Sequence, residues 1–182
     1  MQIEDLFLDG LTLITPRVSR DERGYFFESY RDEFYLKAEI GPFVQDNISF
    51  SCKNTIRAFH FQSLPGQAKL VACLQGEIWD VAVDIRAGSP TFLKWKAILL
   101  NDKNMKQVYI PIGFLHGFCV LSDTAQVQYK VSSPYNPNTE KSVRWNDPEI
   151  GVDWPVKNPI LSLRDQSSPT FQEIRDVVDN RK

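Results

Sequence analysis

The stretch KLVACLQGEIWDVAVDI, residues 69–85, contains two strand-like runs on either side of a turn. Gln75 and Gly76 separate the runs, and aliphatic, β-branched and aromatic residues around such a pair predict a β-hairpin. Side chains alternate in the second run, so Asp80 and Asp84 share one face with Ala82, and the other face carries Trp79, Val81, Val83 and Ile85. Because burying an unpaired carboxylate is prohibitively costly, we expect both acids to face solvent or a polar cavity, with Asp84 as a salt-bridge partner.

Similar short runs recur along the chain between turn-forming residues. The expected strands are residues 11–14, 25–30, 55–62, 69–74, 77–85, 91–99, 107–110, 117–121 and 124–131. Helices are expected only at residues 32–39 and about 168–180, where Phe171, Ile174 and Val178 share one stripe. Many short strands with helices at the margins predict an all-β fold, an antiparallel sandwich or barrel with short peripheral helices.

Length and composition favour one globular domain. The chain has 182 residues, of which 42% are hydrophobic, and this suits a single domain, residues 1–182, with one buried core. Lys and Arg number 21 and Asp and Glu 23, so the net charge is −2 and no nucleic-acid partner is expected. Residues 132–159, which include five prolines, are expected to form an ordered loop that packs on the barrel. Long loops of this kind often cover a site.

The cysteines and the N-terminal residues bear on location. Cys52, Cys73 and Cys119 stand singly in strand-like surroundings, which is typical of buried thiols in a reducing compartment. The first residues carry acids where a secretory signal carries a basic segment, and no apolar run approaches the length of a membrane span. The sequence therefore predicts a cytoplasmic protein with no membrane partner.

His60 lies in the run TIRAFHFQ, residues 55–62, and His116 is the other histidine of the chain. Strict alternation places Arg57 on one face of this strand and His60 with Gln62 on the other. An imidazole can take up a proton near neutral pH, which makes His60 a candidate general base. The alternative is a hydrogen-bonded histidine of the core.

Other kinds of chemistry have weaker support. A catalytic zinc or iron site needs about three His, Asp, Glu or Cys ligands, and the two histidines are far apart in the sequence. The chain contains no Gly-x-Ser-x-Gly elbow, no cysteine in an activating context and no phosphate-binding glycine loop. Acid–base chemistry remains, with Tyr129 and Tyr135 as candidate proton donors.

Ten blocks of sequence stand out when they are taken together. They are DERG (21–24), FVQDN (43–47), RAFHFQ (57–62), QAKLV (67–71), WDVAVDIR (79–86), SPTF (89–92), IPIGFLHGF (110–118), YK (129–130), WNDP (145–148) and LSLRD (161–165). Their order and spacing resemble the dTDP-4-dehydrorhamnose 3,5-epimerase family from about residue 10 to residue 170. A match of this many ordered blocks is far more specific than any single motif.

The resemblance implies a cupin-type jelly roll that acts as a homodimer without metal or cofactor. The implied substrate is a dTDP-linked 4-dehydro-6-deoxyhexose, whose ketone acidifies the hydrogens at C3 and C5. A base removes a hydrogen as an enolate forms, and an acid on the opposite face returns it with inversion. The implied reaction converts dTDP-4-dehydro-6-deoxy-D-glucose into dTDP-4-dehydro-L-rhamnose, a step in the biosynthesis of dTDP-rhamnose and of lipopolysaccharide.

The resemblance also assigns roles to residues of the site. His60 matches the base and Asp165 the carboxylate that orients it. Tyr129 matches the proton donor, and Lys69 matches the cation beside the developing enolate oxygen. The residues that match substrate-binding positions are Arg23, Phe26, Glu28, Gln45, Asn47, Arg57, His116, Tyr135 and Arg164.

Within the substrate-binding set, two arginines match the nucleotide end of the substrate. Arg23 and Arg57 match residues near the diphosphate, an anion to which guanidinium groups are suited. Phe26 can stack on thymine. In the family the strand at residues 23–28 is exchanged between subunits, so each site is expected to include residues of a partner chain.

Three departures from the family pattern leave the specificity open. Ala58 stands where the family usually has glycine, Leu115 replaces a small residue, and SSP at residues 132–134 replaces a polar or aromatic stretch. The sequence therefore does not decide the exact sugar, the nucleotide base or the number of carbons inverted. The alternatives are a mono-epimerase acting at C3 or C5 only, a non-catalytic cupin that binds a sugar nucleotide, and a metal-dependent cupin oxygenase.

Overall fold

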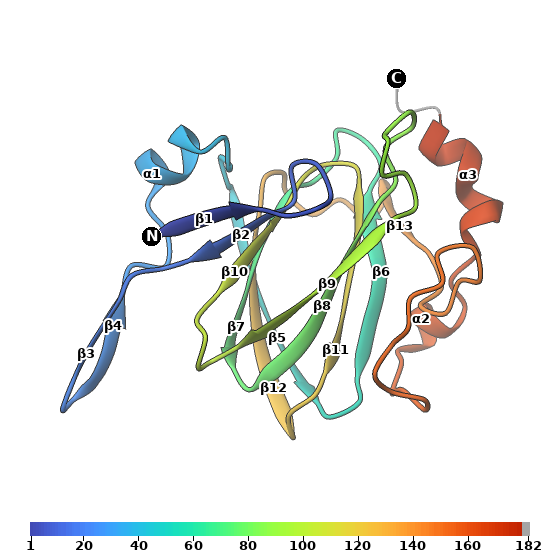
Figure 1. Ribbon diagram of the computed structural model, residues 1–182. Coiled ribbons are helices and arrows are strands. Elements are labelled where there is room, and N and C mark those ends of the chain that lie inside the picture. Colours follow the sequence, from blue (N-terminus) through green and yellow to red (C-terminus); the bar gives the residue numbers. More distant parts are fainter. Residues whose placement is uncertain (180–182) are drawn as a thin grey trace.

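Two antiparallel sheets face each other and form most of the structure, a computed structural model that describes residues 1–179 (Figure 1). One sheet has six strands in the order β1-β2-β10-β7-β12-β5, and the other has five in the order β13-β6-β11-β8-β9. The predicted all-β jelly roll with short peripheral helices is confirmed. A separate two-stranded ribbon, β3-β4, projects from the six-stranded side (Figure 1).

The strands are short, and the helices lie at the margins of the sheets. The strands are β1 Gln2–Asp5, β2 Thr12–Thr15, β3 Val18–Asp21, β4 Gly24–Phe27, β5 Gln45–Cys52, β6 Ile56–Gln62, β7 Lys69–Gln75, β8 Glu77–Asp84, β9 Trp95–Asn101, β10 Gln107–Ile110, β11 Phe114–Val120, β12 Thr124–Val131 and β13 Glu140–Ser142. The helices are α1 Asp32–Lys37, α2 Leu163–Gln166 and α3 Phe171–Asp179.

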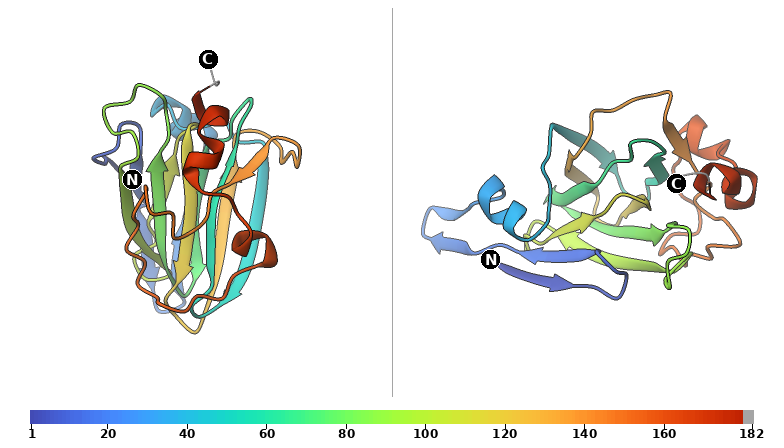
Figure 2. Two further views of the ribbon diagram at one scale, coloured as in Figure 1. Left: turned by 90° about the vertical axis from the view of Figure 1, so that its right-hand side faces the viewer. Right: turned by 90° about the horizontal axis from the view of Figure 1, so that it is seen from above.

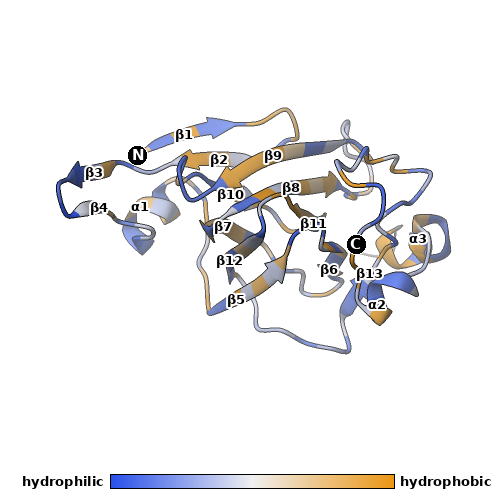
Figure 3. Ribbon diagram, turned by 90° about the horizontal axis from the view of Figure 1, so that it is seen from below, coloured by the Kyte–Doolittle hydropathy of each residue, from blue (hydrophilic) through white to orange (hydrophobic). Residues whose placement is uncertain are grey.

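The main core lies between the two sheets. Alternation turns one set of side chains from each strand inward, for example Val71 and Val127 from the six-stranded sheet and Ala82 and Phe118 from the five-stranded sheet. In Figure 3, hydrophobic residues occupy long stretches of strands such as β8 and β9. The inward-facing positions are apolar over most of the sandwich, and they become polar at the site described below.

The hairpin predicted for residues 69–85 is wrong. β7 pairs with β10 and β12 in one sheet, whereas β8 pairs with β11 and β9 in the other. Gly76, at φ +80°, is the corner at which the chain passes between sheets, and a Cβ there would lie 2.1 Å from the Thr124 carbonyl oxygen. Ser122 Oγ accepts a hydrogen bond from the Glu77 amide at 2.7 Å and supports this corner. The turn residues were recognised correctly, but their local signal does not select the partner strands.

Some predicted boundaries also differ from the structure. The strand predicted at 25–30 ends at Phe27, and residues 91–94 form a turn before β9. β1, β3, β13 and α2 were not predicted, and neither was β5, the edge strand of the six-stranded sheet. In β5 the outward positions Ile48 and Phe50 are 64% and 60% exposed, while the opposite face carries the polar residues Gln45, Asn47, Ser49 and Ser51, which hides the usual pattern. Residue 180, the predicted end of the last helix, lies outside the described residues.

The outer faces of both sheets carry further packing. α3 and residues 143–161 cover the five-stranded sheet, where Phe59, Phe171 and Trp154 belong to one cluster. α1 and the residues after it cover part of the six-stranded sheet, through Tyr35 of the helix and Ile40 beyond its end. Figure 2 shows α1 and α3 at opposite ends of the molecule. The predicted packing of the loop at residues 132–159 on the barrel is confirmed, although the loop contains β13. Within residues 1–179, no helix has the length and apolar composition needed to cross a membrane.

Candidate active site

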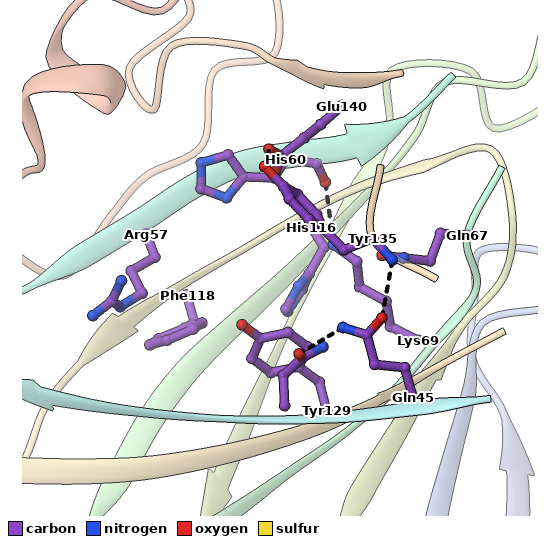
Figure 4. A pocket seen from close by; sticks show the side chains of 11 residues that line it. Gln45, Arg57, His60, Gln67, Lys69, His116, Phe118, Tyr129, Tyr135 and Glu140 are labelled. Atoms are coloured by element: carbon purple, nitrogen blue, oxygen red, sulfur yellow. Dashed lines mark hydrogen bonds between the residues drawn. The ribbon is translucent and has the colours of Figure 1, made fainter. Parts of the chain in front are cut away.

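A cavity of about 320 Å³ lies between the two sheets, in the layer that holds the core elsewhere. Strands of both sheets line it, and Figure 4 shows their side chains around one common space. The lining residues are Gln45, Asn47, Arg57, His60, Gln67, Lys69, His116, Phe118, Tyr129, Tyr135 and Glu140. Because a sandwich interior is normally apolar, this concentration of polar side chains marks a site.

A bulge in β6 brings Arg57 and His60 to the same cavity. In the β6–β11 pairing, His60 lies opposite His116 and Arg57 opposite Phe118, so β6 has one more residue than β11 between these pairs. Strict alternation was therefore the wrong assumption, because a bulge reverses the facing of every later residue. Ala58 and Phe59 both point into the outer cluster as a result. Gly117 makes room for the bulge, since a Cβ there would lie 2.4 Å from the Ala58 Cβ.

The imidazole of His60 is held by a buried carboxylate. His60 Nε2 lies 2.7 Å from Asp165 Oδ1, and Asp165 is 4% exposed. Asp165 belongs to the one-turn helix α2, where Ser162 Oγ caps the helix by accepting from the Asp165 amide at 3.1 Å. Burial alone would raise the pKa of Asp165, but the hydrogen bond with His60 holds it below its usual value. The ionised carboxylate only accepts hydrogen bonds, so Nε2 carries a proton and Nδ1 is left to accept one.

Lys69 brings a cation to the inward face of β7. Its side chain is almost fully buried, and Nζ donates to the His60 carbonyl oxygen over a long 3.4 Å. Burial lowers the pKa of Lys69 to about 8, and the negative charges of Glu140 and Asp80 oppose this shift. An ammonium with so few partners in the protein is available to an oxygen of a bound molecule.

Tyr129 faces the cavity from β12. The side chain is partly buried against the main core, and burial raises the pKa of its phenol. The phenol therefore keeps its proton at neutral pH. Since β12 belongs to the six-stranded sheet and β6 to the five-stranded sheet, Tyr129 and His60 approach the cavity from opposite walls (Figure 4).

His116 forms a second imidazole–carboxylate pair. His116 Nε2 lies 2.8 Å from Asp80 Oδ2, and Asp80 is fully buried on β8. Burial lowers the pKa of His116, and the charge of Asp80 opposes that shift. The expectation for Asp84 is confirmed, because it forms a salt bridge to Arg86 at 2.8 Å and lies away from the cavity.

Polar contacts fix the mouth of the cavity. Gln45 Oε1 accepts from the Tyr135 amide at 3.0 Å, and Gln45 Nε2 donates to Asn47 Oδ1 at 2.8 Å. The Glu140 carboxylate accepts from the Tyr135 hydroxyl at 2.9 Å and from Arg164 at 2.6 Å. Arg164 is therefore connected to the cavity through Glu140 and does not line it. The side chain of Arg57, from β6, is held against β5, because its Nε donates to Ser51 Oγ at 3.0 Å.

Besides Arg164, three predicted substrate-binding residues lie outside the cavity of their own chain. Arg23, Phe26 and Glu28 lie on or next to the β3–β4 ribbon, which points away from the sandwich (Figure 1). Arg23 pairs with Asp21 and Phe26 is 77% exposed. Glu28 pairs with Arg31.

No metal cluster is found in the part of the chain that the structure describes. Within residues 1–179, no three His, Cys, Asp or Glu side chains gather as the ligands of a metal ion would.

The family model for dTDP-4-dehydrorhamnose 3,5-epimerase matches residues 5–173 of this chain. The chain belongs to the dTDP-4-dehydrorhamnose 3,5-epimerase family. A dTDP-4-dehydrorhamnose 3,5-epimerase from Neisseria gonorrhoeae is 46% identical to this chain over 176 residues. The match covers 95% of this chain and 53% of the relative, so the chain spans about half the length of that protein. A dTDP-4-dehydrorhamnose 3-epimerase from Streptomyces niveus is 40% identical over 97% of this chain and 87% of its own length.

Solved structures of the epimerase family agree with the fold. A dTDP-6-deoxy-D-glucose-3,5-epimerase from Legionella pneumophila, in complex with dTDP-4-keto-L-rhamnose, superimposes with a TM-score of 0.93 at 42% identity. The match covers 97% of this chain and 96% of that one. The family that the sequence blocks resemble is thus confirmed.

The departures from the epimerase family pattern do not lie on the cavity wall. Ala58 and Leu115 are fully buried in the cluster on the outer face of the five-stranded sheet. Ser132 and Ser133 bond to residues 66–68, the loop that carries Gln67. Ala58 and Leu115 therefore do not shape the cavity directly, and the bulge is what turns Ala58 outward.

Sequence reasoning missed three lining residues of the epimerase cavity, namely Gln67, Phe118 and Glu140. Gln67 and Phe118 lie inside matched blocks, so their positions could have been chosen from the resemblance. Glu140 lies in the segment taken for a loop, and only the pairing of β13 with β6 brings it to the site.

Proposed function

We propose that this chain is a cofactor-independent epimerase that inverts C3 and C5 of a dTDP-linked 4-dehydro-6-deoxyhexose. The proposed reaction converts dTDP-4-dehydro-6-deoxy-D-glucose into dTDP-4-dehydro-L-rhamnose. One observation carries the proposal: an imidazole backed by a carboxylate, a phenol and a buried ammonium share one cavity, with the imidazole and phenol on opposite walls. Epimerisation next to a ketone requires a base, an acid on the other face and a positive charge near the oxygen.

The proton transfers follow from these positions. His60 Nδ1 takes the proton from C3 or C5, the electrons of the broken C–H bond form the enolate, and its negative charge develops on the ketone oxygen. Lys69 donates to that oxygen, and this interaction strengthens as charge develops, so it lowers the barrier. Tyr129 then donates its proton to the opposite face of the carbon, which inverts the centre. Asp165 stabilises the imidazolium that exists between the two transfers.

The nucleotide end of the substrate is assigned to the mouth of the cavity and to a partner chain. Arg57 offers a guanidinium for the diphosphate, with Gln45, Asn47 and Tyr135 nearby. We propose a homodimer with strand exchange, in which the partner's β3–β4 ribbon supplies a second arginine and an aromatic ring. The exposed Ile48 and Phe50 on edge strand β5 support an interface there, since exposed apolar edge strands are usually covered.

Hydrogen exchange with solvent tests the function. In deuterium oxide, wild-type protein given the 4-dehydro-6-deoxy-D-glucose nucleotide should place two deuterons in the product, and His60→Ala should place none. A single deuteron would instead support a mono-epimerase, the name carried by the Streptomyces niveus relative. Exchange that does not depend on His60 would contradict the assignment of the base, and binding without any exchange would indicate a non-catalytic sugar-nucleotide protein.

Two further expectations complete the proposal. We propose that residues 1–182 act as one epimerase domain, and that the protein works in the cytoplasm. All three cysteines are free thiols, as is usual in a reducing compartment. Cys73 and Cys119 are buried as predicted, whereas the prediction that Cys52 is buried is wrong, because its side chain is exposed.

A further inference from the structure

Asp80 is a fully buried carboxylate for which the fold gives no adequate reason. Its Oδ2 accepts from His116 Nε2 at 2.8 Å, while Oδ1 is buried and has no hydrogen-bond partner among the described residues. A buried charge with one unsatisfied oxygen costs stability. A buried oxygen without a hydrogen-bond partner next to a site indicates a functional role for its residue.

Asp84, on the same face of β8, is a buried carboxylate with a purely structural role. Asp84 is equally buried, but both of its oxygens are satisfied by Arg86, Ser89 and Thr91 at 2.5–3.0 Å. Asp84 therefore closes a turn, whereas Asp80 contacts a side chain that lines the cavity. The two residues form a natural pair for comparison.

The geometry of Asp80 determines the hydrogen-bonding character of His116. An ionised carboxylate only accepts, so the proton of the imidazole is on Nε2. Nδ1 has no hydrogen-bond partner among residues 1–179, and His116 lines the cavity beside Lys69. A neutral imidazole held in this way presents a lone pair, and next to it the ammonium presents N–H donors.

We propose that Asp80 is a positioning residue that fixes His116 as a hydrogen-bond acceptor in the cavity and, together with Glu140, supplies negative charge for Lys69. The proposal rests on the proposed function and deepens it. The pair suits a ketone oxygen next to a hydroxyl group, because Lys69 donates to the ketone and His116 accepts from the hydroxyl. A 4-dehydro sugar with a free hydroxyl at C3 has this arrangement.

The charges around the pair set the expected pH dependence. His116 is faced by Asp80 from β8, Lys69 from β7 and His60 from β6, and Lys69 is faced by Glu140 from β13 and by Asp80. Tyr129 and Arg57 line the same cavity. Removing the charge of Asp80 favours loss of the Lys69 proton. Because activity needs the ammonium of Lys69, a variant without the charge of Asp80 should lose activity at a lower alkaline pH than the wild type does.

The first test is kinetic and compares Asp80→Asn with Asp84→Asn. We expect Asp80→Asn to lower kcat at least about tenfold, the size of losing a hydrogen bond to a charged group. In the pH profile of kcat, the alkaline limb of this variant should lie roughly one pH unit lower than that of the wild type. Asp84→Asn should lower thermal stability without moving that limb. If Asp80→Asn keeps the wild-type kcat and limb, or changes only stability, the positioning role is overturned.

The second test reads the imidazole directly and does not need the Asp80 variant to fold. The chain has two histidines, so nitrogen NMR of protein labelled with ¹⁵N-histidine gives two imidazoles, and His60→Ala identifies that of His116. We expect a neutral ring at pH 7 with the proton on Nε2 and an unprotonated Nδ1. A proton on Nδ1, or an imidazolium at pH 7, would overturn the proposal. Wild-type protein without any exchange activity would instead refute the proposed function, whatever the state of His116.

Discussion

Replacing Lys69 by methionine should make the protein more stable and inactive. The ammonium of Lys69 is almost fully buried, and its hydrogen bond to the His60 carbonyl oxygen is long, at 3.4 Å. Methionine has a similar length and fills the same space without a charge. The substitution therefore removes a desolvated charge at little loss of packing, and it removes the group that stabilises the enolate.

The magnitude follows from the change in the pKa of Lys69. Burial lowers it from 10.5 to about 8, which corresponds to a cost on the order of 3 kcal/mol for keeping the buried group charged at neutral pH. Between pH 8 and 10.5 the unfolded chain binds more protons at this site than the folded one, so wild-type stability rises with pH. The advantage of the variant should thus be fully present below about pH 8 and lost by about pH 10.5.

Urea unfolding at pH 7 and at pH 10.5 measures this difference, and deuterium exchange measures activity. Lys96→Met, at an exposed position of β9, is the matched control and should change stability little. The reasoning is refuted if Lys69→Met is less stable than wild type at pH 7, or if its advantage is the same at both pH values. Retained activity would remove Lys69 from the enolate site.

Four other predictions test separate parts of the site. Tyr129→Phe should lower turnover at least about 10²-fold, with little change in nucleotide affinity measured by calorimetry. Asp165→Asn should also lower turnover at least about 10²-fold, and a loss below twofold would show that His60 does not need its carboxylate. Arg57→Ala should mainly raise KM, and an unchanged KM would remove it from the diphosphate site. If strands are exchanged, inactive His60→Ala and Arg23→Ala chains refolded together should regain activity, because one site of each mixed dimer is intact; a mixture no more active than its components would contradict the exchange.

The overall class of the fold could be predicted from the sequence because it depends on local patterns. Alternating runs, turn residues and sparse helical stripes are properties of neighbouring residues, and they indicated most strands of both sheets correctly. Among the strands that were not predicted, β5 was missed for a physical reason. Its inward face lines a polar cavity, so Gln45 and Asn47 occupy positions where a strand usually shows apolar residues.

The site could be predicted only in part. Ordered blocks of residues pointed to His60, Lys69 and Tyr129, and the structure brings these three to one cavity. Glu140 and Asp80 were not predicted for the site. Asp80 was recognised as an acid that needs a polar environment, but its partner could not be found locally, since His116 is 36 residues away in the sequence.

The amino-acid sequence by itself determined the strand-rich class, the family and the residue types available for proton transfer. The tertiary structure decided which strands pair across the Gly76 corner, and it decided through the β6 bulge that Arg57 and His60 share a cavity. It also placed Asp165 against His60, 105 residues away. The physical reason is that strand pairing and register are chosen by contacts between distant segments, whereas propensity and alternation express only the preferences of neighbours.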